Sequence, residues 1–168
     1  MKNIFALFVI LAFSALAFGQ QAKAKPLPET FNATALDGQT FELAELKGKV
    51  VVLTFWLTRC AICHSEIPKL NRLVKTHKDD DVVFLGLSME NENKIASFLK
   101  KTAFDFNILP NSFGVVLKYA DKSNNGAINM GFPAHFLINQ KGEIELRTNG
   151  FDKSKILDAE INRLLLNK

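Results

Sequence analysis

The chain has 168 residues, of which 48% are hydrophobic and 15 are phenylalanine, enough to build one domain around a substantial apolar core. The formal net charge is +4, and the basic residues are scattered along the chain rather than clustered. Scattered charge of this size excludes the basic footprint of a nucleic-acid-binding protein.

Residues 1–19 predict a secretory signal peptide. Lys2 precedes an apolar run over residues 4–18 in which Ser14 is the one polar residue, and the small Gly19 before the polar Gln20 suits a cleavage site. The run is 15 residues long, shorter than the roughly 20 residues of a membrane-spanning helix, although an uncleaved anchor stays the alternative. We therefore expect an exported, periplasmic or extracytoplasmic protein that is soluble after cleavage and membrane-tethered without it.

Residues 20–28 are polar, contain prolines and show no periodicity, which predicts a flexible lead. The remaining residues, 29–168, are expected to form one domain. Its first part, residues 31–42, reads as two short strands around the turn signal Asp37-Gly38. This pattern predicts an N-terminal β-hairpin, which we expect on the edge of the main sheet, followed by a short helical turn over residues 43–49.

Residues 50–56 are apolar or β-branched without polar alternation, which predicts a strand buried on both faces of a sheet. The chain then turns at residues 57–59, presents Cys60, and continues as a helix to about residue 77. Pro68 lies inside this helix, where a proline removes one hydrogen bond and causes a kink. Open α/β sheets carry their chemistry at the carboxyl edge of such strands, so Cys60 marks the candidate site.

The remaining elements alternate strands and helices before an antiparallel pair and a closing helix. In order they are a strand at 82–87, a helix at 92–101, a strand at 104–109, a short helix at 112–119, a polar loop at 121–129, antiparallel strands at 134–139 and 143–148, and a helix to residue 166 capped by Asp152. This alternation predicts the α/β class.

Cys60 and Cys63 lie three residues apart in the first turn of the predicted helix, so they share one side and can close a small disulfide ring. Cys60 is the natural nucleophile, because the helix N-terminus and the neighbouring Arg59 stabilise its thiolate. Cys63 is one turn deeper, where we expect it to be shielded and to resolve a mixed disulfide. A bridge across so short a loop stabilises a fold little, which favours redox chemistry over a structural role.

The same segment leaves other classes of protein open. Cys60-Ala61-Ile62-Cys63-His64 also matches the C-x-x-C-H pattern of haem attachment, although a porphyrin would have little room between a buried strand and its helix. A metal carrier that uses the two cysteines with His64 or His135 is a third reading. A peroxidase of the Thr-x-x-Cys type is disfavoured, because Leu57 stands where the threonine would be.

Residues around the motif carry a family resemblance. They are Phe55-Trp56 before the cysteines, Glu66 and Pro68 after them, and residues 131–139, which read GFPAHFLIN. From about Leu27 to its C-terminus the chain resembles the thioredoxin superfamily, and within it the exported TlpA/ResA-type thiol-disulfide oxidoreductases. The resemblance implies a thioredoxin-like fold, in which helices flank a central mixed sheet and the N-terminal hairpin is an addition.

The resemblance implies that Glu66 is a third catalytic residue. In similar reductases a glutamate at this position of the motif assists proton transfer at the two cysteines. Thioredoxins themselves keep a buried aspartate two residues before the tryptophan, and this chain has Thr54 there. Since threonine does not accept a proton near neutral pH, the task would fall to Glu66.

The implied substrate-binding residues are Trp56, Phe132 and Pro133. Pro133 would be a cis-proline that faces the cysteines, and the backbone of Phe132 would pair with an extended substrate peptide by strand addition. Relatives usually carry a smaller residue at the position of Phe132, and often threonine at the position of His135. The substrate preference of those relatives therefore does not transfer to this chain.

Three further residues would modulate the cysteines. Arg59 brings a cation to a position that is often tryptophan in relatives, and His64 and His135 could converge near the sulfurs. By resemblance the protein would be a monomeric reductant of protein disulfides, recharged by a membrane electron-donor protein, as are relatives that act on the cysteines of apocytochrome c. Its only redox group would be the Cys60–Cys63 disulfide, without a bound cofactor or metal.

Overall fold

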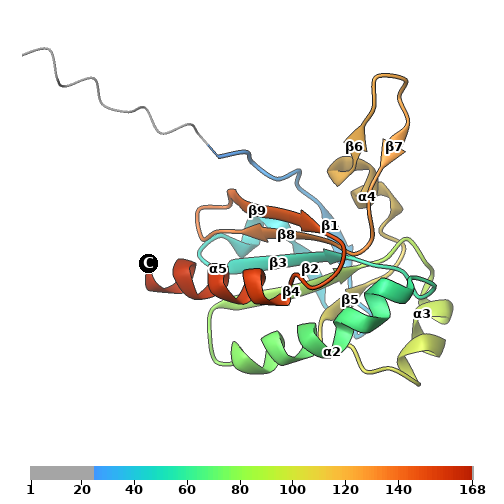
Figure 1. Cartoon of the computed structure of the whole chain (residues 1–168), viewed down its shortest axis with the longest axis horizontal. Helices are drawn as coiled ribbons and strands as arrows, with labels where there is room; N and C mark the ends of the chain where they lie inside the picture. The colour runs from blue at the N-terminus through green and yellow to red at the C-terminus, as the bar shows by residue number, and fades with distance from the viewer. Residues whose placement is uncertain (1–24, 168) are drawn as a thin grey trace, which may run out of the picture.

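A five-stranded mixed sheet forms the centre of the protein in the computed structural model, which describes residues 25–167 (Figure 1). The strand order is β5-β4-β3-β8-β9. The strands are β3 (Val50–Phe55), β4 (Val82–Leu87), β5 (Asn107–Leu109), β8 (Ala134–Ile138) and β9 (Ile144–Asn149). β3, β4 and β5 run parallel, β8 is antiparallel to β3, and β9 is antiparallel to β8. The predicted α/β class with a central mixed sheet is confirmed.

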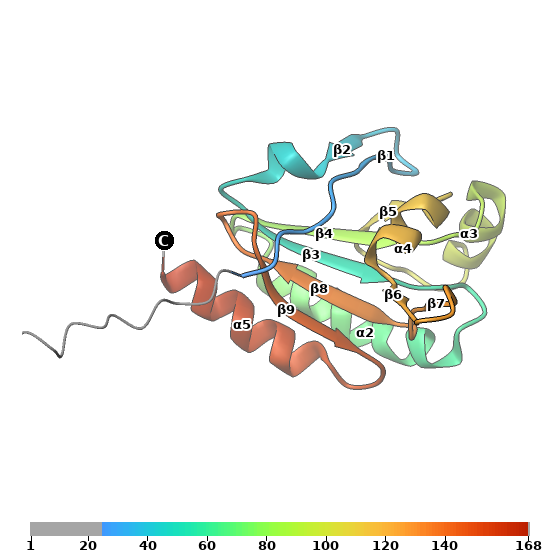
Figure 2. The ribbon, with the colours of Figure 1, turned by 90° about the horizontal axis from the view of Figure 1, so that it is seen from above.

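Helices cover both faces of this sheet (Figure 2). They are the short 3-10 helix η1 (Leu43–Leu46), α2 (Ala61–Thr76), α3 (Glu92–Leu99), α4 (Phe113–Tyr119) and α5 (Ser154–Leu166). α2 and α5 lie on one face, and α4 lies on the other face with the N-terminal hairpin. β5 starts at Asn107 rather than at the predicted residue 104, because only residues 107–109 pair with β4, whereas the backbone of Ala103 and Asp105 hydrogen-bonds the side chain of Asn71.

β3 is buried on both faces, as its apolar sequence predicts. Because successive side chains of a strand point to opposite faces, Val50 and Val52 pack with α2 and α5, whereas Val51, Leu53 and Phe55 pack with α4 and the hairpin. Each fully buried side chain of this kind contributes roughly 1.5–3 kcal/mol. The carboxyl end of β3 is therefore firmly held.

The predicted N-terminal hairpin is present, but its expected position at the edge of the main sheet is wrong. β1 (Asn32–Thr34) and β2 (Thr40–Glu42) pair with each other in a separate two-stranded sheet. Gly38 takes the positive φ of 88° that the turn requires. The buried rings of Phe31 and Phe41 join the core on one side of the main sheet, so the hairpin lies across a face and not along an edge.

The segment predicted as a polar loop at 121–129 forms a second small hairpin, which projects from the body of the protein (Figure 1). It consists of β6 (Asp121–Lys122) and β7 (Ile128–Asn129). The turn contains Asn125-Gly126, with Gly126 at a φ of 79°, and this dipeptide is a common hairpin signal. At the base, Arg147 on β9 donates two hydrogen bonds of 2.7 Å to Asp121.

The start of the described chain contacts the sheet. The carbonyl of Pro26 accepts a hydrogen bond of 2.8 Å from the N–H of Ile144, and Lys25 forms an ion pair of 2.5 Å with Glu145 on β9. The predicted signal peptide, residues 1–19, and the first part of the predicted lead lie outside the described residues. Within residues 25–167, no helix is long and apolar enough to cross a membrane.

Asp152 does not cap α5, contrary to the prediction. The N-cap residue is Lys153, and Asp152 has a left-handed φ of 59°. Its carboxylate accepts a hydrogen bond of 2.7 Å from Lys69 on α2 instead. This contact ties the loop before α5 to the helix that carries the cysteines.

Candidate active site

The Cys-x-x-Cys motif lies where β3 meets α2. The N–H of Cys60 donates to the carbonyl of Leu57 over 3.1 Å, which closes a tight turn between strand and helix. Cys60 is the N-cap residue of α2, and its Sγ accepts a hydrogen bond of 3.1 Å from the N–H of Cys63. The prediction that Cys60 lies at the helix N-terminus is confirmed. Negative charge on its sulfur would be stabilised there.

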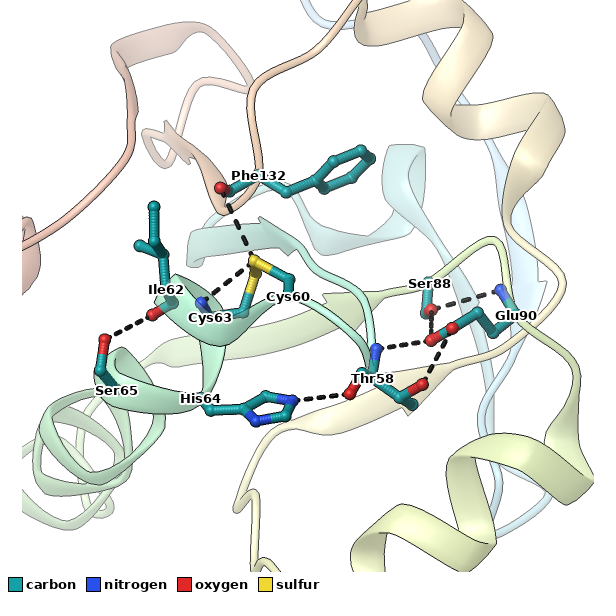
Figure 3. The surroundings of a disulfide bond; sticks show 9 residues. All are labelled: Thr58, Cys60, Ile62, Cys63, His64, Ser65, Ser88, Glu90 and Phe132. Atoms are coloured by element: carbon teal, nitrogen blue, oxygen red, sulfur yellow. Dashed lines mark hydrogen bonds between the residues drawn. A yellow bond between two sulfur atoms is a disulfide. The ribbon is translucent and has the colours of Figure 1, made fainter.

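Cys60 and Cys63 form a disulfide, so the structure represents the oxidised protein (Figure 3). Cys63 is only 2% exposed, whereas Cys60 is half-buried. Thiol–disulfide exchange requires that an attacking sulfur reach its target. A partner sulfur therefore has access to Cys60 and not to Cys63, as the motif predicts.

Pro133 lies at the same edge of the sheet as the disulfide. The Phe132–Pro133 peptide bond is cis, as predicted. Ala134, the next residue, begins β8 and pairs with Phe55 at the end of β3. This register brings the Phe132 carbonyl oxygen to 3.7 Å from the Sγ of Cys60 (Figure 3).

Glu66 is a fully buried carboxylate, with 0% of the residue exposed. It lies three residues after Cys63 on the buried side of α2, one helical turn away. One oxygen accepts a hydrogen bond of 3.3 Å from the N–H of Lys153, and the other lies 3.4 Å from the ammonium of Lys69. A hydrogen bond to Asp152 is the main reason why the pKa of Lys69 is raised, so Lys69 remains a cation beside Glu66.

His135 is also fully buried, on β8 opposite Thr54. Its Nδ1 lies 3.0 Å from the Thr54 hydroxyl, and its Nε2 has no hydrogen-bond partner among residues 25–167. Burial, with a smaller contribution from the charge of Lys153, lowers the pKa of His135 to about 4. The imidazole is therefore neutral at pH 7.

His64 and Arg59 lie on the solvent side of the motif. The Nε2 of His64 donates a hydrogen bond of 2.6 Å to the carbonyl of Thr58, and its ring centroid lies 4.8 Å from that of Phe98 in a tilted contact. His64 and His135 are thus engaged on different elements, with Thr58 and with Thr54 respectively. Arg59 is exposed immediately before Cys60.

Trp56 lies in the interior rather than at the surface, with only 1% of the residue exposed. Its ring packs against Phe98 and Phe104 at centroid distances of 5.4 and 5.2 Å. Gly86 on β4 gives it room, because a Cβ there would lie 3.3 Å from the indole nitrogen. Trp56 therefore packs in the core immediately before the turn. A direct contact with a substrate would require the ring to move.

Glu90 is a residue of the site that sequence reasoning missed. Its carboxylate accepts hydrogen bonds from the Thr58 N–H at 2.6 Å and from the Thr58 hydroxyl at 2.9 Å. A signal was available: Glu90 follows β4 closely, and the carboxyl ends of neighbouring parallel strands meet at one sheet edge. A lone glutamate after a strand is too common to single out without the structure.

No group of three or more His, Cys, Asp or Glu side chains within residues 25–167 is arranged to hold a metal ion. The side chains proposed for metal or haem carriage are otherwise engaged, since Cys60 and Cys63 are joined to each other and His64 binds Thr58. The side chains that a metal or haem carrier would use are therefore not available together in the oxidised protein.

The sheet order and the cysteine pair at the start of α2, together with a matching family model and relatives named thiol-disulfide oxidoreductases, identify the chain as a thiol-disulfide oxidoreductase of the thioredoxin superfamily. More narrowly, the chain belongs to the AhpC/TSA family, whose model matches residues 19–147. The resemblance inferred from the sequence is confirmed.

Relatives and solved structures agree with this assignment. Thiol-disulfide oxidoreductase ResA of Bacillus thuringiensis subsp. konkukian is 28% identical over 135 residues, which cover 80% of this chain and 74% of the relative. A thiol:disulfide interchange protein of Chlorobium tepidum TLS shares the fold, with a TM-score of 0.71 at 22% identity over 84% of this chain and 97% of that one. StoA of Bacillus subtilis matches with a TM-score of 0.63 at 25% identity, covering 79% and 96% of the two chains.

Proposed function

We propose that this oxidoreductase works as a reductant of disulfides in protein substrates, with Cys60 as the nucleophile and Cys63 as the resolving thiol. The observation that carries the proposal is the unequal access to the two sulfurs. Cys60 is half-buried at the N-cap of α2 and Cys63 is 2% exposed behind it. Only Cys60 can meet a large substrate.

The reaction runs in two exchanges. The Cys60 thiolate attacks a substrate disulfide, one substrate sulfur leaves as a thiolate, and a mixed disulfide forms. Cys63 then attacks the Cys60 sulfur, which releases the second substrate thiolate and leaves the Cys60–Cys63 disulfide. Two electrons have passed to the substrate, and an external dithiol must return them. We propose a membrane electron-donor protein as that source.

Glu66 would take the proton from Cys63 as it becomes the attacking thiolate. A carboxylate buried one turn from this cysteine, and held by Lys69 and the Lys153 N–H, supports the role. Glu66 and Cys63 lie on the same face of α2, because residues three apart are neighbours on a helix. The carboxylate could therefore reach the Cys63 sulfur without a rearrangement of the helix.

The substrate would bind along the backbone of Phe132 and over Pro133, because the Phe132 carbonyl lies at the reactive sulfur. Trp56 supports this surface from the interior, and Arg59 adds a cation beside the Cys60 thiolate. His64 and His135 would tune the site through the turn and the sheet that hold it.

Residues 1–19 and the resemblance to exported reductases support an extracytoplasmic location. Reductants are needed there because cysteines otherwise oxidise. Apocytochrome c, whose cysteines must be reduced before haem attachment, is the substrate that the resemblance suggests first. We propose that the protein acts as a monomer.

Reduction of insulin disulfides in the presence of dithiothreitol tests the disulfide-exchange activity and the nucleophile. The wild-type protein should accelerate precipitation of the insulin B chain, and Cys60→Ser should abolish the acceleration. Reduced Cys63→Ser, incubated with insulin after dithiothreitol is removed, should instead accumulate a mixed disulfide with the substrate, visible on a non-reducing gel. Activity that survives Cys60→Ser would exclude the assigned nucleophile, and a Soret band in the purified protein would favour haem carriage.

A further inference from the structure

The turn before Cys60 is held from both sides by side chains that lie outside it (Figure 3). The N–H and hydroxyl of Thr58 both donate to the carboxylate of Glu90, at 2.6 and 2.9 Å. The carbonyl of Thr58 accepts a hydrogen bond of 2.6 Å from the Nε2 of His64. Every polar atom of this central turn residue is thus used, which fixes the orientation of its two peptide planes.

The carboxylate of Glu90 is ionised, largely buried and bonded to its neighbours, and is not a solvated surface group. Its side chain is 9% exposed and forms an ion pair of 2.6 Å with Lys94 on α3. Ser88 donates a further, longer hydrogen bond of 3.4 Å to the same carboxylate. Burial alone would raise the pKa of Glu90, but the hydrogen bonds from Lys94 and Thr58 outweigh burial and lower it. The carboxylate therefore stays charged through the range in which a cysteine titrates.

The contacts of Thr58 bear directly on the reactive sulfur. The turn closes through the N–H of Cys60, two residues after Thr58, so the orientation of Thr58 sets where the helix begins. At that start the Sγ of Cys60 accepts the N–H of Cys63 at 3.1 Å, the same interaction that would stabilise a thiolate. Two residues of α3 contact these partners of Thr58: Lys94 forms the ion pair with Glu90, and the ring of Phe98 packs against that of His64.

We propose that Glu90 is a positioning residue for Cys60, which holds the Thr58 peptide so that the sulfur stays over the N-terminus of α2. The inference rests on the proposed function, in which Cys60 is the nucleophile. Without the carboxylate, the turn samples other orientations and the thiolate loses part of its stabilisation. The pKa of the Cys60 thiol then rises, and its attack at neutral pH slows.

The test measures the pH dependence of Cys60 alkylation in the reduced, full-length protein. Iodoacetamide labels the thiolate, and mass spectrometry assigns the label to Cys60 rather than Cys63. In Glu90→Ala and Glu90→Gln the midpoint should move to higher pH, and the labelling rate near pH 6 should fall roughly threefold to tenfold. Thr58→Val should give a smaller change in the same direction, since it removes the hydroxyl hydrogen bond and keeps the N–H one.

Glu92→Gln is the matched control, because it removes the same charge from an exposed position in the first turn of α3. The other charged or titratable groups around the turn, Arg59, His64 and Lys94, stay in place in every variant. The control should keep the wild-type midpoint. A shift of similar size in Glu92→Gln would mean that net charge, and not the hold on Thr58, sets the reactivity, and would overturn the inference.

Urea unfolding of the oxidised variants separates positioning from folding. A merely structural role would lower the unfolding midpoint and leave the alkylation midpoint of the folded protein unchanged, which would overturn the inference, as would failure of both Glu90 variants to fold. Insulin reduction by the wild-type protein is measured alongside. If that reaction is absent while the alkylation midpoint still shifts in the Glu90 variants, the positioning holds and the proposed function is wrong.

Discussion

Acidification should weaken the fold through one buried side chain, His135. Burial, followed by the charge of Lys153, lowers its pKa from the ordinary 6.5 to about 4 in the folded protein. In the unfolded chain the imidazole regains its ordinary pKa. Below pH 6.5 the unfolded state therefore binds a proton that the folded state does not bind until about pH 4. Stability is lost as the pH falls through this window and is unaffected by His135 above it.

The size of the loss follows from the width of the window. Each unit of pKa difference corresponds to about 1.4 kcal/mol, so the whole window is worth roughly 3 kcal/mol. At about pH 5 the imidazole of His135 is mostly protonated in the unfolded state but still mostly neutral in the folded state. The expected loss in the free energy of unfolding is about 2 kcal/mol. That amount is a substantial part of the total stability of a domain of this size.

Urea unfolding of the oxidised protein near pH 7.5 and near pH 5 measures this loss, with His135→Gln as the comparison. Glutamine keeps a polar group toward Thr54 but has no proton to gain. The wild-type protein should lose about 2 kcal/mol more than the variant on acidification, and the two should change in parallel between about pH 7.5 and 9. Parallel behaviour down to pH 5 would refute the reasoning, because it would mean that the buried imidazole can be protonated without cost.

Two other substitutions test the site and its support. Glu66→Gln should shift the pH profile of insulin reduction with little loss of stability, since glutamine can still accept the Lys153 N–H; an unaltered profile would remove Glu66 from the mechanism. Gly86→Ala should lower the free energy of unfolding by roughly 1–3 kcal/mol, because the new Cβ would lie 2.8 Å from the Cδ1 of Ile108 beneath Trp56. Gly114→Ala, in α4 with nothing within 4 Å of its Cβ position, is the control and should be neutral or stabilising on urea unfolding; equal losses at both glycines would contradict the packing argument.

Local patterns were enough to predict the centre of this fold. The apolar run of β3 and the cysteines that follow it specify a buried strand, a turn and a helix start, and Cys60 lies at the N-cap as expected. The cis state of Pro133 came from resemblance rather than from local physics, since the bond preference of an isolated proline is trans.

Features that depend on distant partners could not be predicted in the same way. Aspartate is a residue type that often caps helices, but the carboxylate of Asp152 accepts a hydrogen bond from Lys69 on another helix and does not cap α5. Glu90 looks like an ordinary loop residue until the parallel pairing of β3 and β4 brings it to Thr58. The predicted position of the N-terminal hairpin was wrong for a related reason. Phe31 and Phe41 pack into the core against a face of the main sheet, so the hairpin does not extend the sheet at its edge.

The reduction potential of the Cys60–Cys63 couple decides whether the protein can work as a reductant. The protein is equilibrated with dithiothreitol or glutathione buffers of known potential, and free thiols are trapped and counted by mass. We expect a single two-electron transition near −270 mV, about the value of thioredoxin and suited to a reductant. A transition near −120 mV, about the value of a strong oxidant, would contradict the proposed direction, and a pair that stays oxidised in every buffer would contradict its redox function altogether.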